Sequence, residues 1–85
     1  MDATFTLQVG EKYDYQADMS TIWAGDTIST VAWVFPTGLT KGAESNTTTA
    51  ATVWVTRTES GTKVVKGTIT STAGRIEVIS WMFIE

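Results

Sequence analysis

The sequence contains no cysteine and no histidine. Without cysteine, the chain forms no disulfide and offers no thiolate ligand to a metal ion. Without histidine, it lacks the commonest general base and the commonest zinc ligand. The P-loop and GxGxxG phosphate-binding motifs are also missing. These absences predict a protein that is not an enzyme and that holds no metal and no cofactor.

The nearest approach to a metal site is a group of three aspartates. Asp14 and Asp18 share one face of an expected strand, and Asp26 follows them. Calcium loops pack their oxygen ligands more densely than this, and EF-hand spacing is absent. We interpret these aspartates as solvated strand residues and as caps of turns.

Length and charge narrow the range of partners. A chain of 85 residues fits one domain, which we expect to span residues 1–85. Its net charge of −3 argues against binding nucleic acid. No apolar run approaches the ~20 residues of a membrane span, and the N-terminus lacks the pattern of a secretory signal, so we expect synthesis in the cytoplasm and no membrane partner. A small core gains stability when it associates with other chains, which favours a multi-copy assembly.

Apolar and polar residues alternate along most of the chain, as they do in half-buried strands. Threonine and valine are abundant, and turn residues recur roughly every 8–12 positions, the spacing typical of sandwiches. The alternating segments are residues 5–9, 13–18, 31–35, 51–56, 65–70 and 76–84. The pattern predicts an all-β fold, an immunoglobulin-like β-sandwich of about seven short strands.

Several segments interrupt the alternation. Met19–Trp23 is compatible with a single helical turn, and Lys41–Asn46 is polar and predicts a loop. Ser60–Gly61 is a hairpin signal, and Ala73–Gly74 marks the next turn. Trp23 lies in a turn region, where we expect its ring to close one end of the sandwich.

The inward-facing positions of the expected strands define the core. Trp33 stands in the third or fourth strand, where sandwiches often keep a core tryptophan. The expected core comprises Trp33, Phe35, Val53, Val55, Ile69, Ile79, Trp81 and Phe83.

The last strand is apolar on both faces, although a strand of a small sandwich normally has one face in water. Opposite its core residues lie Ile76, Val78, Met82 and Ile84. Either a loop of this chain or a neighbouring subunit covers them, and the short loops favour the subunit. Exposed apolar patches of this kind mark interaction surfaces.

Trp54 shares its face with Thr52 and Thr56, so its ring is either exposed or covered by another chain. Val34 lies on the face opposite Trp33 in another strand that is apolar on both sides. The expected partner interface comprises Trp54, Val78, Met82, Ile84 and Val34. Four tryptophans in so short a chain also leave open a carbohydrate-binding module.

Several segments together resemble the phage fibre–tail adaptor family of small immunoglobulin-like virion proteins. They are Gly25-Asp26-Thr27-Ile28, then Ala32-Trp33-Val34-Phe35-Pro36-Thr37-Gly38-Leu39-Thr40, Thr49-Ala50-Ala51-Thr52-Val53-Trp54-Val55, Ile69-Thr70 and Ser71-Thr72-Ala73-Gly74-Arg75. The resemblance runs from about Tyr13 to Phe83. Phe35 replaces the family's usual smaller aliphatic residue, and Val78, Met82 and Ile84 stand where polar residues are common.

The resemblance implies a structural, non-enzymatic virion protein made in the bacterial host. It implies a multi-copy adaptor in the neck, in the tail or at the base of fibres, with other phage structural proteins as partners. A capsid-decorating or cementing protein of the same fold is the alternative, and a sugar-binding module for host recognition is a further one.

Overall fold

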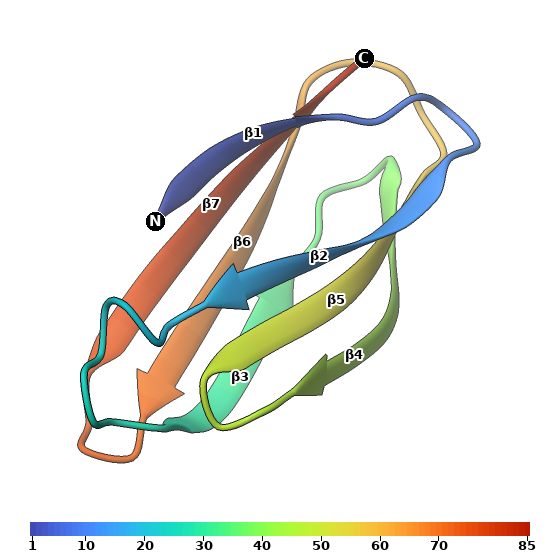
Figure 1. Ribbon diagram of the computed structural model, residues 1–85. Coiled ribbons are helices and arrows are strands. Elements are labelled where there is room, and N and C mark those ends of the chain that lie inside the picture. Colours follow the sequence, from blue (N-terminus) through green and yellow to red (C-terminus); the bar gives the residue numbers. More distant parts are fainter.

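The computed structural model describes residues 1–85 and contains seven strands. It has no helix that is long and apolar enough to cross a membrane. The strands are β1 (Asp2–Thr6), β2 (Lys12–Asp18), β3 (Ile28–Val34), β4 (Leu39–Asn46), β5 (Ala50–Arg57), β6 (Lys63–Ser71) and β7 (Ile76–Ile84). They form two layers (Figure 1): sheet A has the order β1-β7-β6-β3, and sheet B has the order β2-β5-β4. The predicted all-β sandwich is confirmed.

The strand order is that of an immunoglobulin-like domain. The neighbours β3-β6-β7 correspond to the C, F and G strands of that fold, and β2-β5-β4 correspond to its B, E and D strands. β1 completes sheet A by pairing in parallel with β7, whereas the other pairs are antiparallel. Hairpins join β4 to β5 and β6 to β7, and the remaining connections cross between the sheets.

The expected loop at Lys41–Asn46 is wrong, because these residues form most of β4. β4 is an edge strand, so its side chains face largely into water and a polar composition costs little. Its register shifts between Lys41 and Glu44, and this irregularity hides the alternation in the sequence. Gly42 lies within the shift, where an added Cβ would come within 3.0 Å of Cβ of Trp54.

The expected hairpin at Ser60–Gly61 is also wrong. The turn joins β5 in sheet B to β6 in sheet A, so the two strands never pair. Gly61 has a φ of +100°, which accounts for the local turn signal but says nothing of the sheet that the next strand enters. Ala73–Gly74, by contrast, closes the true β6–β7 hairpin, with the Gly74 amide donating to the Ser71 carbonyl at 3.0 Å.

One turn of helical geometry connects β2 to the loop before β3. The Trp23 amide donates to the Met19 carbonyl at 2.9 Å, and the Asp18 carboxylate accepts from the Ser20 amide at the same distance. Trp23 is buried at this end of the sandwich, as expected.

The core lies between the sheets. Six of the eight expected core residues are buried, namely Val53, Val55, Ile69, Ile79, Trp81 and Phe83. Trp33 and Phe35 are only half-buried and pack against this cluster. The difference arises because β3 is an edge strand, so no further strand of this chain covers Trp33 from the side, and Phe35 follows the strand's end.

Candidate interaction surfaces

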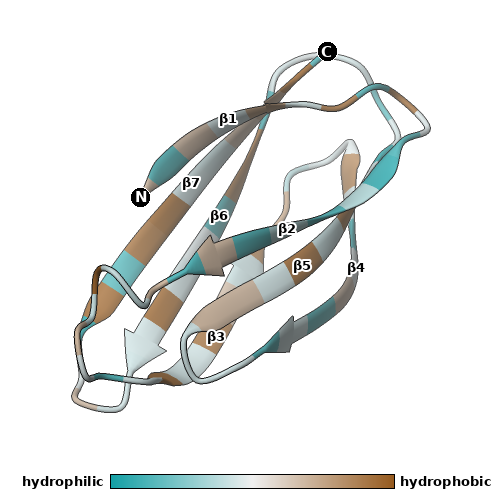
Figure 2. Ribbon diagram, in the orientation of Figure 1, coloured by the Kyte–Doolittle hydropathy of each residue, from teal (hydrophilic) through white to brown (hydrophobic).

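The outer face of sheet A carries an exposed apolar row along β7, the β7 stripe, formed by Ile76, Val78, Met82 and Ile84. Their exposed fractions run from 65% at Ile76 to 36% at Ile84. Brown bands recur along β7 in Figure 2, whereas β2 and β4 carry teal bands. Because the stripe is open to solvent, no loop of this chain covers the second apolar face of the last strand.

Neighbouring strands extend this apolar surface beside Met82. The register places Val64 of β6 on one side of Met82 and Thr4 of β1 on the other. A shallow hollow of about 260 Å³ opens here, with Ala3 and Ser80 also in its lining. Val34 lies on β3 at the far edge of the same sheet and is 67% exposed. The predicted residues Val34, Met82, Val78 and Ile84 therefore share the outer face of one sheet.

Trp54 lies on the opposite outer face, in the central strand of sheet B. Its side chain is 38% exposed and stands across the register from Asp14. Nζ of Lys12 lies 5.7 Å from the ring centroid, a cation–π distance. Gly42 of β4 has no side chain to crowd the base of the indole. Trp54 is thus a partly exposed aromatic surface, with Lys12 near its ring and Asp14 opposite it in the neighbouring strand.

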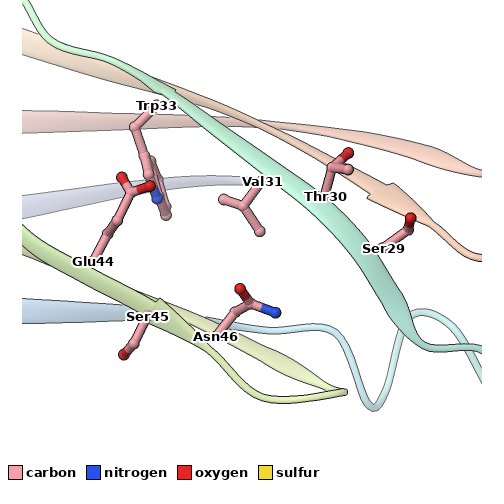
Figure 3. Close-up of a pocket in the computed structure, with 7 residues that line it drawn as sticks. All are labelled: Ser29, Thr30, Val31, Trp33, Glu44, Ser45 and Asn46. Carbon is pink, nitrogen blue, oxygen red and sulfur yellow. The ribbon is translucent and has the colours of Figure 1, made fainter.

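A second hollow, of about 320 Å³, opens along the side of the sandwich between β3 and β4. Figure 3 shows Val31 and Trp33 pointing from β3 into this space, with Glu44 and Asn46 rising toward them from β4. Ser45 points away from it. Both apolar residues are half-buried, so the hollow exposes part of the core at an open side.

The sequence matches the family Gp77, described as "Podophage GP4 fiber-tail adaptor protein gp77", over residues 8–83. The chain belongs to the Gp77 family. No curated protein matches it. The family match confirms the resemblance drawn from the sequence and supports a structural tail-adaptor role.

The three aspartates do not meet in this Gp77-family domain, and no group of three or more acidic side chains is placed to hold a metal ion. Asp26 instead accepts from the Thr27 amide at 2.8 Å and from the Arg75 guanidinium at 2.7 Å. The Ser71 hydroxyl is the largest influence on the pKa of Asp26, and with the Thr27 amide and Arg75 it outweighs desolvation and lowers this pKa to about 2. Asp26 therefore ties the loop before β3 to the β6–β7 hairpin.

Arg57 is a structural residue that the sequence did not single out. It is fully buried, and its guanidinium donates to the carbonyls of Glu59, Gly61 and Phe83 at 2.9, 2.6 and 2.9 Å. Its Nε has no partner. These bonds join the end of β5, the crossover to β6 and the end of β7. A lone arginine in a polar stretch carries no signal of burial, so only the tertiary structure reveals this role.

Proposed function

We propose that this chain is a non-enzymatic, multi-copy structural protein of a tailed-phage virion, made in the bacterial host. It lies in the neck or tail or where fibres attach, and it bridges other structural proteins of the particle. The observation that carries the proposal is the β7 stripe, an uncovered apolar row on a domain of the fibre–tail adaptor family. Burial of such a row against a partner is favourable because it removes apolar surface from water.

An adaptor needs two contact surfaces that do not compete. The β7 stripe and Trp54 lie on the outer faces of different sheets, so they point away from each other. Tryptophan is enriched among the residues that dominate interface energies. We assign the β7 stripe, with Val34, to one structural partner and Trp54 to another.

The hollows support a role without catalysis. The hollow between β3 and β4 contains a single titratable side chain, Glu44, and the hollow beside Met82 contains only Asp2. Neither brings an acid and a base together, which general acid–base chemistry requires. We expect neither nucleic acid nor membrane among the partners, in keeping with the net charge of −3.

The test compares two double variants. Each replaces one valine and one larger apolar residue, and the exposed fractions of the replaced residues are similar in the two variants. Val78→Thr with Met82→Thr alters the stripe, whereas Val9→Thr with Ile22→Thr alters residues that are 51% and 45% exposed elsewhere. Both double variants should fold as isolated domains, as judged by circular dichroism. In phage carrying each variant, mass spectrometry of purified particles should show at least about tenfold less of the stripe variant. Equal incorporation of both would refute the assignment.

Copy number separates the main alternative from this proposal. A capsid-decorating protein would be present in hundreds of copies per particle, whereas a neck or tail adaptor would number a few to a few dozen. The exposed ring of Trp54 also keeps a sugar-binding module as a candidate. Binding on a glycan array that disappears in Trp54→Ala would favour that function, and an array without binding would remove it.

A further inference from the structure

The sheet edges differ in how they are protected from pairing with another chain. β2 carries Lys12, Asp14 and Asp18, and β4 combines two charges with a register shift. β1 has only five residues and starts with an aspartate. β3 has seven residues, Ile-Ser-Thr-Val-Ala-Trp-Val, with no charge and no proline; its register shifts between Ile28 and Thr30 and is regular in the five residues from Thr30 onward. Charges, bulges and short length keep edge strands from pairing, and β3 is the one edge of the four that carries no charge, so it is the least protected edge.

Val31 and Trp33 present the free backbone groups of this edge. The Thr72 amide donates to the Thr27 carbonyl at 2.9 Å across the β6–β3 boundary. Amides alternate sides along a strand, so Thr70, Thr68 and Lys66 of β6 also face β3. Their register partners on β3 are Thr30, Ala32 and Val34, which therefore face β6. Val31 and Trp33 therefore direct their N–H and C=O groups away from β6.

We propose that β3 pairs antiparallel with β3 of a second copy of this chain, about a two-fold axis at Ala32. In this register Val31 of each copy exchanges backbone hydrogen bonds with Trp33 of the other, and Ala32 lies opposite its own counterpart. The four strands of sheet A then continue into the four of the second copy. This pairing goes beyond the adaptor role proposed above, because it assigns a contact between copies.

The hollow between β3 and β4 favours a second copy as the occupant. Val31 and Trp33 line it and are half-exposed there (Figure 3). In the proposed register, Trp33 of the second copy lies opposite Val31 of the first, and Val31 of the second copy lies opposite Trp33. All four side chains point into the space between the sheets. Pairs of an aromatic and a β-branched residue across antiparallel strands are stabilising. The association therefore covers the part of the core that an isolated chain leaves open.

The charges near the edge are compatible with a second copy. β3 has no charged residue, so its pairing with itself brings no like charges together along the strand. On the β4 edge below, Glu44 lines the hollow, and its Oε2 lies 3.0 Å from Nζ of Lys41 in the same chain. This ion pair offsets the carboxylate charge that each copy brings toward the axis.

Covalent trapping tests the register. The natural chain has no cysteine, so Ala32→Cys places a single thiol at the axis. Opposed residues of a non-hydrogen-bonded antiparallel pair have Cα atoms about 4.5 Å apart, within the range of a disulfide. Mild oxidation should convert most of the Ala32→Cys protein into a dimer on a non-reducing gel. Thr68→Cys, on the β6 residue that pairs with Ala32, should stay mainly monomeric; equal trapping of the two would overturn the register.

Charge complementation tests the contact itself. The unaltered chain should sediment with twice the mass of one chain. Ala32→Lys and Ala32→Glu should each weaken dimerisation by at least about tenfold, because like charges meet at the axis, and an equimolar mixture should restore the dimer. Ala32 is exposed on the outer face, so both variants should keep the fold. Thr68→Lys should dimerise like the unaltered chain.

Two results would overturn the β3 pairing: a natural chain that stays monomeric up to about 1 mM, or a dimer that neither Ala32 variant weakens. These results do not bear on the adaptor role, because particle incorporation of the β7 stripe variants is a separate measurement. Conversely, a dimer that Val78→Thr with Met82→Thr dissociates but Ala32→Lys does not would place the contact on the stripe and refute pairing at β3.

Discussion

The indole of Trp33 occupies the space that a side chain on Gly67 would need. The two residues are register partners across β3 and β6, and a Cβ built on Gly67 would lie 2.6 Å from Cζ3 of Trp33. The same indole packs against Trp81, with ring centroids 5.1 Å apart. The missing side chain at Gly67 thus allows a tryptophan on an edge strand to lie across its neighbour and reach the core.

Gly67→Ala should therefore destabilise the domain, although alanine is otherwise the better strand residue. The new methyl group would displace the Trp33 ring, and overpacking of this kind costs about 1–3 kcal/mol. Urea unfolding should show the loss, and near-ultraviolet circular dichroism should report a changed tryptophan environment. Thr68→Ala, on the exposed face of the same strand, should stay within about 0.5 kcal/mol of the natural chain. A Gly67→Ala protein of unchanged stability would show that the ring is not held where the structure places it.

Arg57→Met should destabilise the domain, although the methionine side chain is similar in length to that of arginine. The substitution removes the charged donor from the buried Phe83 carbonyl and from the partly buried carbonyls of Glu59 and Gly61. Loss of hydrogen bonds to a charged group costs about 1.5–3 kcal/mol. Thermal and urea unfolding measure the loss, with Lys66→Met as the control, since Lys66 is exposed and substitutions of exposed residues usually change stability by no more than about 0.5 kcal/mol. Equal stability of the two variants would contradict the structural role of Arg57.

Asp26 should make stability depend on pH in the acid range. Its pKa is about 2 in the folded chain, below the value of about 3.9 of an unperturbed aspartate. Above pH ~4 the carboxylate is ionised in both states and its stabilising contribution is complete. As the pH falls from ~4 to ~2, the unfolded chain takes up the proton first and this contribution is lost.

The carboxylate signal of Asp26 should accordingly titrate near pH 2 in an NMR experiment. Asp26→Asn should lower stability at pH 7 and flatten the decline of stability between pH 4 and pH 2. A titration midpoint near pH 4 would show that Ser71, Thr27 and Arg75 do not hold this carboxylate as described.

The alternation of side chains in the sequence was sufficient to sort the residues of β7. It placed Ile79, Trp81 and Phe83 on one face and Val78 and Met82 on the other, and the structure buries the first set and exposes the second. This succeeded because successive side chains of a strand point to opposite faces, a local property of the backbone. The same reasoning identified Trp54 as a residue that its own chain does not bury.

The sequence by itself therefore determined the fold class, the face on which most apolar residues lie and the family. It did not determine which strands are neighbours. That choice made Lys41–Asn46 an edge strand, sent the turn at Ser60–Gly61 across to the other sheet and left Trp33 half-exposed. Only the tertiary structure decided these features, and with them the burial of Arg57 and the open edge of β3, because strand pairing depends on contacts between residues far apart in the chain.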